Sequence, residues 1–202
     1  MRLGASVLWL CVALAPELPS APALAAAPPA WGLTELMAGL RSVKSASGQF
    51  TERKTLHLVS QPLVSSGTLL YVAPDQVQKI TVSPQWERLS LDGDMLTITG
   101  GGQGQSRTLS LESYPQVAAF VEGVRATLAG DQSALEHYYI VQLAGTPANW
   151  QLLLAPREEK LRKLVRWIRI WGDQDKIRTV ETEEGDGDHS EMSIVEDIHD
   201  RR

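Results

Sequence analysis

The chain has 202 residues, with 19 lysine and arginine residues against 24 aspartate and glutamate residues, so its formal net charge is −5. This mildly acidic balance excludes the basic footprint of a nucleic-acid-binding protein. The length is enough for one domain with a substantial core, and a charged fraction of 21% is ordinary for a folded protein.

The N-terminus has the three parts of a secretory signal peptide. Arg2 supplies a positive start, Leu3–Ala15 is apolar, and Ala23-Leu24-Ala25 offers small residues for cleavage. A membrane anchor is the alternative, but prolines break the apolar run before it reaches the ~20 residues that span a bilayer. We expect residues 1–25 to be removed and residues 26–30 to form a disordered tether. The only cysteine, Cys11, is then lost, which excludes disulfides and fits a bacterial periplasm.

A long hairpin over Ser47–Val72 is the predicted nucleus of the fold. Residues from Phe50 onward alternate in character, which indicates a strand that is charged at Glu52–Lys54 and apolar at Leu56–Val59. The second run, Gly67–Val72, is rich in β-branched and aromatic residues and reads as its antiparallel partner.

Helices are expected on either side of a strand meander. Apolar residues at helical spacing predict an amphipathic helix over Leu33–Val43, and a second stripe from Val117 to Leu128 predicts a helix that ends at Gly130. Alternation and turn residues predict the remaining strands, which cover residues 77–83, 85–91, 94–99, 105–111, 137–143, 149–154, 176–183 and 189–195.

The segment Glu158–Trp171 fits two patterns. Leu161, Leu164 and Ile168 follow a helical stripe, whereas the residues after Leu164 also alternate as in a strand. Because β-branched and aromatic residues gather there, we expect a helical turn at Arg157–Leu161 and a strand at Lys163–Trp171. A basic amphipathic membrane helix is the alternative.

No motif for catalysis or metal binding is present. There is no G-x-S-x-G sequence, and the four histidines have no ligand spacing. The acidic run Glu181–Asp188 lacks the spacing of an EF-hand loop and is interpreted as a solvated hairpin tip. The glycines at 100–104 lack the Lys-Ser/Thr of a P-loop. We therefore predict a protein that is not an enzyme and has no cofactor.

Binding in an apolar cavity is the more plausible activity. About eleven meandering strands with inserted helices predict a curved antiparallel sheet, and such sheets enclose cavities that hold acyl chains or hydrophobic peptides. The alternative is that every apolar side chain fills an ordinary core.

Several motifs, in order, resemble the LolA-like outer-membrane lipoprotein carriers. These are S-G-Q-F-T-E at Ser47–Glu52, S-G-T-L-x-Y-x-x-P at Ser66–Pro74, L-D-G-D at Leu91–Asp94, and the closing strand pairs through Gly187 and Asp188. The resemblance covers most of the mature chain. It implies a mainly β fold with helices, an incomplete eleven-stranded antiparallel β-barrel whose mouth the helices cover.

The resemblance also implies a function. A monomer in the periplasm would shield the acyl chains of a lipoprotein or other lipid cargo, passing it from an inner-membrane ABC transporter or other lipid exporter to an outer-membrane receptor. Typical carriers keep an arginine before the proline of the second strand to lock the helical lid, but Ala73 stands there. A periplasmic sensor or adaptor of the same fold that binds a protein partner is the alternative.

The expected lipid-carrier domain spans residues 31–197, followed by a tail at 198–202. Its predicted cavity residues come from both halves of the sheet and from the second helix: Phe50, Leu69, Tyr71, Ile80, Trp86, Leu96, Ile98, Phe120, Val124, Trp150 and Ile168.

Overall fold

The computed structural model of the chain describes residues 31–100 and 105–197. Within these ranges the strands are β1 Ser45–Thr55, β2 Leu63–Val72, β3 Gln76–Ser83, β4 Glu87–Asp92, β5 Met95–Gly100, β6 Ser106–Ser110, β7 Tyr139–Thr146, β8 Asn149–Pro156, β9 Val165–Asp173, β10 Lys176–Glu184 and β11 His189–Glu196. The helices are α1 Leu33–Ser42, the 3-10 turn η2 Leu111–Ser113, α2 Pro115–Ala129, α3 Gln132–Tyr138 and α4 Glu159–Arg162. The expected signal peptide, tether and tail lie outside the described residues and remain predictions.

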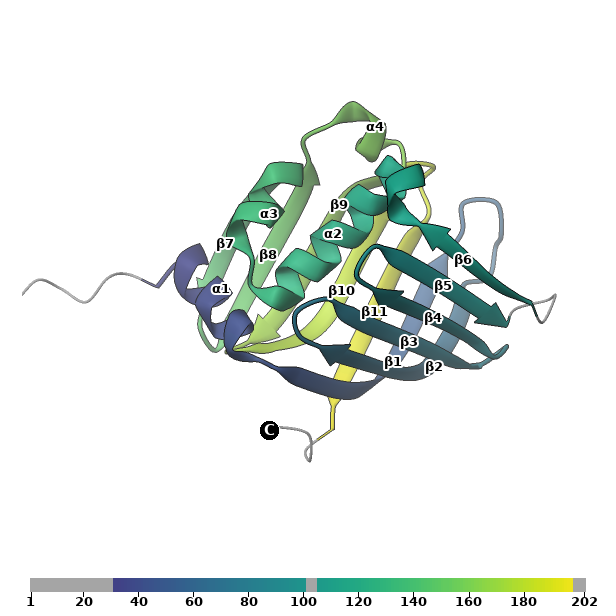
Figure 1. The fold of residues 1–202 in the computed structure, drawn as a ribbon, viewed down its shortest axis with the longest axis horizontal. Coiled ribbons are helices and arrows are strands. Elements are labelled where there is room, and N and C mark those ends of the chain that lie inside the picture. Colours follow the sequence, from purple (N-terminus) through teal and green to yellow (C-terminus); the bar gives the residue numbers. More distant parts are fainter. Residues whose placement is uncertain (1–30, 101–104, 198–202) are drawn as a thin grey trace, which may run out of the picture. The chain divides into compact units, whose positions relative to one another are not determined.

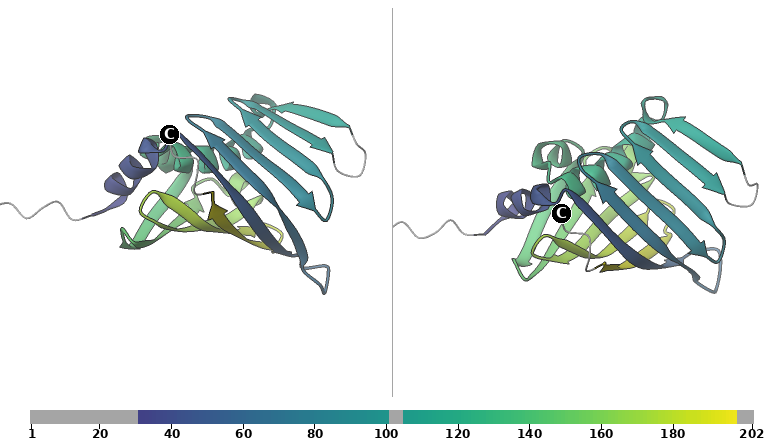
Figure 2. Two further views of the ribbon diagram at one scale, coloured as in Figure 1. Left: turned by 90° about the horizontal axis from the view of Figure 1, so that it is seen from below. Right: turned by 60° about the horizontal axis from the view of Figure 1, so that its bottom comes forward.

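The strands form one antiparallel sheet in the order β6-β5-β4-β3-β2-β1-β11-β10-β9-β8-β7. The first and last strands of the chain therefore pair in its middle, and β6 and β7 are its two edges (Figure 1). The sheet bends into two halves, β1–β6 and β7–β11, with the helices on its concave side (Figure 2). This open sheet confirms the predicted incomplete eleven-stranded barrel.

Local chemistry sets the helix ends. Glu35 accepts a hydrogen bond from the Gly32 N–H at 2.9 Å at the start of α1, and Asp131 accepts one from the Ala134 N–H at 3.0 Å at the start of α3. Gly130 ends α2 with a φ of 61°, a left-handed conformation that glycine adopts without strain. Among the described residues, no helix is long and apolar enough to cross a membrane.

The larger core lies between the helices and strands β7–β9. Trp150 is fully buried there, and its indole N–H donates to the Gln174 carbonyl at 2.9 Å. Leu36 and Met37 of α1 and Leu135 of α3 cover the same strands. This arrangement confirms a strand where Lys163–Trp171 was predicted, although β9 begins at Val165 and ends at Asp173; it supplies Ile168 and Ile170 to this core.

The first predicted strand ends earlier than expected. β1 stops at Thr55, and the apolar residues Leu56–Val59 form a turn that the Leu56 carbonyl closes by accepting from the Val59 N–H at 3.1 Å. The sequence pattern was misleading here because Leu58 and Val59 are exposed rather than packed on the sheet.

We expect a glycine in α2 to be required by packing. A Cβ at Gly123 would lie 2.5 Å from the ring of the fully buried Tyr139. Alanine is about 1 kcal/mol better than glycine inside a helix, but overpacking costs about 1–3 kcal/mol, so Gly123→Ala should lower the free energy of unfolding. Urea unfolding followed by circular dichroism measures this change.

Gly39→Ala in α1 is the matched control. A Cβ there meets nothing within 4 Å, so the helix propensity of alanine should raise the free energy of unfolding by about 0.5–1 kcal/mol. Equal effects of the two substitutions would contradict close packing of α2 on β7.

Candidate ligand-binding face

Strand pairing arranges the concave side of β1–β6, here called the inner face, into three rows. The row nearest the start of α2 is almost wholly apolar and consists of Ala46, Tyr71, Val77, Leu91, Leu96 and Leu109. The middle row is mixed and consists of Gly48, Leu69, Lys79, Leu89, Ile98 and Arg107. The third row has no apolar side chain after its first residue and consists of Phe50, Gly67, Thr81, Glu87 and Gly100.

Burial is greatest at Phe50 and in the first row, where Tyr71, Leu91 and Leu96 are buried. Leu91 and Leu96 of the first row are buried in a small cluster with Leu111, against Val117 and Val121 nearby. The side chains of the middle row from Leu69 to Ile98 remain half-buried. The helices cover the β7–β9 counterparts of these residues, so on the concave side of the sheet the inner face of β2–β5 keeps partly accessible apolar side chains.

An ion pair lies within this surface. The Lys79 ammonium is 2.5 Å from Glu52 Oε2 and 4.9 Å from the centre of the Phe50 ring, which gives a salt bridge and a cation–π contact together. The Tyr71 hydroxyl is buried and has no hydrogen-bond partner among the described residues. Burial, and then the charge of Asp75, raises the pKa of Tyr71. The inner face is therefore amphipathic: it is apolar in the row nearest the start of α2 and carries charged groups toward Glu52 and Lys79.

The residues predicted from sequence separate into three groups. Five are buried: Phe50, Tyr71, Leu96, Trp150 and Ile168. Four are half-buried on the concave side or on α2: Leu69, Ile98, Phe120 and Val124. The remaining two lie elsewhere, since Ile80 alternates with Lys79 onto the opposite, outer face and Trp86 is 46% exposed just before β4. Sequence reasoning missed Leu89 and Lys79, which the strand register would have identified as neighbours of Leu69 and Ile98.

A shallow pocket on the outer face is a poorer candidate. Its volume is about 190 Å³. Most of its lining, including Leu70, Val72, Gln78 and Ser90, has the parity opposite to that of the inner face, and Val77 and Leu91 of the first row also contribute. Ligand sites for drug-sized molecules usually exceed about 300 Å³.

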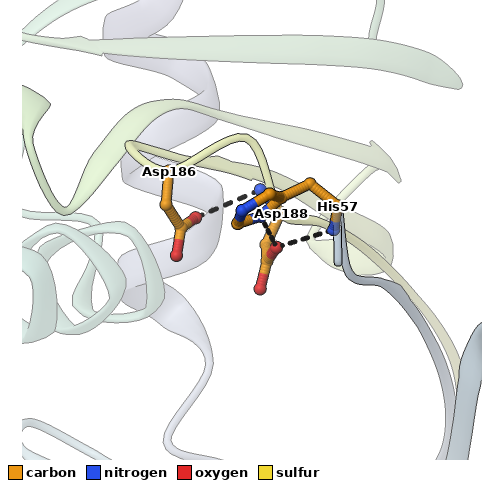
Figure 3. A group of neighbouring side chains, drawn as sticks. All are labelled: His57, Asp186 and Asp188. Atoms are coloured by element: carbon orange, nitrogen blue, oxygen red, sulfur yellow. Dashed lines mark hydrogen bonds and ion pairs between the residues drawn. The ribbon is translucent and has the colours of Figure 1, made fainter. Parts of the chain in front are cut away.

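Asp188 connects two loops at one end of the sheet. Its Oδ1 accepts hydrogen bonds from the His57 backbone N–H at 3.0 Å and from the His57 ring Nδ1 at 2.8 Å (Figure 3). These bonds hold the β1–β2 loop against the β10–β11 turn. The interpretation of the acidic run as a solvated tip is therefore wrong for Asp188, whose residue is only 8% exposed.

The same cluster is a poor candidate for a metal site. One ligand atom from each of His57, Asp186 and Asp188 lies within 4.8 Å of the others. The Asp186 carboxylate, however, already accepts from the Asp188 N–H at 3.1 Å, and the Lys54 ammonium lies 4.0 Å from Asp188 Oδ2, where it disfavours a second cation. The geometry serves the loop connection better than ion binding.

The hydrogen bonds of Asp188 should make the free energy of unfolding depend on pH in the acidic range. The hydrogen bond from the His57 side chain, with its backbone N–H, holds the pKa of Asp188 below its ordinary value of 3.8. Asp188 therefore stabilises the folded protein above pH 3.8, and this contribution is lost as the pH falls through the lower pKa of the folded state. Thermal unfolding from pH 7 to pH 2.5 should show less acid sensitivity in Asp188→Asn than in the unchanged protein. An unchanged slope below pH 4 would contradict this role.

Ala73 stands at the position of the lid arginine but has no side chain that could hold a helix. It follows β2, and its N–H donates to the Lys44 carbonyl at 2.9 Å. Another arginine ties the helices together, since Arg41 of α1 donates to the Gly130 carbonyl at the end of α2 at 2.7 Å. A cation at a helix C-terminus is favourable because of the helix dipole.

The sequence from residue 25 to residue 196 matches the family described as outer membrane lipoprotein carrier protein LolA-like. The chain belongs to this LolA-like family. No curated protein matches it at a significant level.

Three solved structures are similar to this LolA-like chain. A LolA superfamily protein from Nitrosomonas europaea has 10% identity and a TM-score of 0.46, with 86% of this chain and 96% of that chain covered. A DUF1329 family protein from Desulfovibrio piger has 10% identity and a TM-score of 0.45, covering 81% and 88%. MucB, in complex with MucA(peri), has 14% identity and a TM-score of 0.39, covering 81% and 54%.

Proposed function

We propose that this LolA-like protein is a periplasmic, non-enzymatic carrier that shields the acyl chains of a lipoprotein or other lipid on the way to the outer membrane. An inner-membrane ABC transporter or other lipid exporter would load it, and an outer-membrane receptor would take the cargo. Family membership supports the general role. The observation that carries the proposal is the graded inner face of β1–β6, where half-buried leucine and isoleucine side chains continue an apolar row.

The gradient suggests how cargo would lie. An acyl chain would contact Leu69, Leu89 and Ile98, and its polar head would lie toward Glu52 and Lys79. Burying about eight methylene groups contributes roughly 6 kcal/mol, which corresponds to a Kd on the order of 40 µM. Because charged side chains lie beside the apolar rows, the cargo is expected to be an amphiphile rather than a pure hydrocarbon.

Two measurements test this function. Native mass spectrometry of the protein purified from the periplasm should show a bound acyl lipid or lipoprotein, and titration with a dansyl-labelled fatty acid should give saturable fluorescence. Failure of both would overturn the carrier role. A stable complex with a protein partner that forms without lipid and ignores added fatty acid would instead favour the sensor or adaptor alternative.

A further inference from the structure

Six large apolar side chains are exposed at the ends of adjoining strands. We call this surface the apolar tip; it consists of Leu58, Val59, Leu63, Val64, Val82 and Trp86. The exposed fraction reaches 84% for Leu58 and 61% for Val82. Exposed patches of this kind on a folded protein mark an interaction site.

The strand register places these residues together. Leu63 and Val64 begin β2 opposite Lys54 and Arg53 of β1, and Val82 occupies the bulge where β3 pairs with Ser66 and Gly67, two residues further along β2. Trp86 directly precedes β4, whose first residue pairs with Thr81. The loop between β1 and β2, which carries Leu58, projects beyond the neighbouring strands (Figure 2).

The apolar tip is fixed in its exposed position. The two hydrogen bonds from His57 to Asp188 hold the residue next to Leu58, so the loop is anchored to the β10–β11 turn. A hydrophobic loop without such an anchor would be expected to collapse onto the sheet. The anchored loop instead leaves Leu58 and Val59 pointing away from the apolar core.

Charge distinguishes the possible partners. No acidic or basic residue occurs from Leu58 to Val72 or from Ile80 to Trp86. Two arginines flank this neutral surface: Arg53 pairs with Val64 on one side and with Glu191 on the other, and the Arg88 guanidinium lies 5.8 Å from the centre of the Trp86 ring. Exposed apolar residues that include a tryptophan match the acyl and interfacial regions of a membrane, and the flanking Arg53 and Arg88 match the phosphates of anionic lipids.

We propose that the apolar tip docks this protein on the surface of an anionic membrane. Leu58 and its apolar neighbours would enter the interface, while Arg53 and Arg88 would contact lipid phosphates. The inference goes beyond cargo binding and does not depend on it, because the tip lies outside the inner-face rows.

Flotation with vesicles tests the docking surface. The full-length mature protein should float with vesicles of phosphatidylethanolamine and phosphatidylglycerol, and more weakly with phosphatidylcholine alone. Leu58→Asp should weaken binding about tenfold, because a buried leucine contributes about that factor in affinity. Arg53→Gln with Arg88→Gln should reduce binding to the anionic vesicles and flatten its salt dependence.

Matched controls keep the proposal falsifiable. Val195→Asp changes a side chain that is 69% exposed on β11, and Lys44→Gln removes a cation beside α1; neither should alter flotation. Absence of flotation by the unchanged protein, or equal losses in Leu58→Asp and Val195→Asp, would overturn the proposal. Self-association abolished by Leu58→Asp without vesicle binding would overturn it in favour of a second copy. Fatty-acid titration of the same variants separates this result from a failure of the carrier function.

Discussion

Replacing Trp150 with alanine is expected to lower the free energy of unfolding by about 3–5 kcal/mol. The side chain is fully buried in the larger core, and its ring fills the space over Gly172, where a Cβ would lie 2.2 Å from the indole. Truncation leaves a cavity and also removes the hydrogen bond to the Gln174 carbonyl. Because domains are stable by only about 5–15 kcal/mol, the variant should unfold on the order of 2 M earlier in urea.

Trp86→Ala is the control for this prediction. The same ring is removed from a side chain that is 46% exposed and contacts Arg88, so the loss should stay near 1 kcal/mol. Far-UV circular dichroism is the suitable probe, since tryptophan fluorescence changes with the substitutions themselves. Similar urea midpoints for the two variants would show that Trp150 is not a core residue.

The contrast between these tryptophans shows what periodicity can and cannot predict. Trp150 alternates with Leu152 and Leu154 in β8, and all three are fully buried, so the parity of the predicted strand over 149–154 indicates which of its residues share the core side. Trp86 precedes β4, so the alternation of side chains along that strand does not predict which face it lies on. The strand prediction was also wrong at Leu56–Val59. An apolar turn that is held by Asp188 has the same residue types as the continuation of a strand.

Register explains the other difference between sequence and structure. The eleven strands and the order of the hairpins could be predicted from turns and alternation. The faces could not, because assigning Ile80 or Ile98 to one side requires knowing which residues pair, and a shift of one residue exchanges the two faces. The bulge between Ser66 and Gly67 adds such a shift within the central hairpins. The Asp188–His57 contact joins residues 131 positions apart and left no local signal.

Two isoleucines on opposite faces provide the sharpest test of the proposed ligand-binding face. Ile98 lies on the inner face, opposite Leu89, whereas Ile80 lies on the outer face, opposite Thr68 and Arg88. Both are half-buried strand residues. Ile98→Asp places a carboxylate where the acyl chain should lie, and desolvating it should weaken fatty-acid binding by at least about tenfold.

Ile80→Asp carries the same change in charge and size but should leave the Kd within about twofold, because its carboxylate faces away from the cargo. Both variants are titrated with the dansyl-labelled fatty acid after circular dichroism has shown that they remain folded. If both lose binding equally, the effect comes from the sheet as a whole. If only Ile80→Asp loses binding, the acyl chain lies on the outer face, where the shallow pocket beside Leu70 and Val72 would take the place of the inner-face rows.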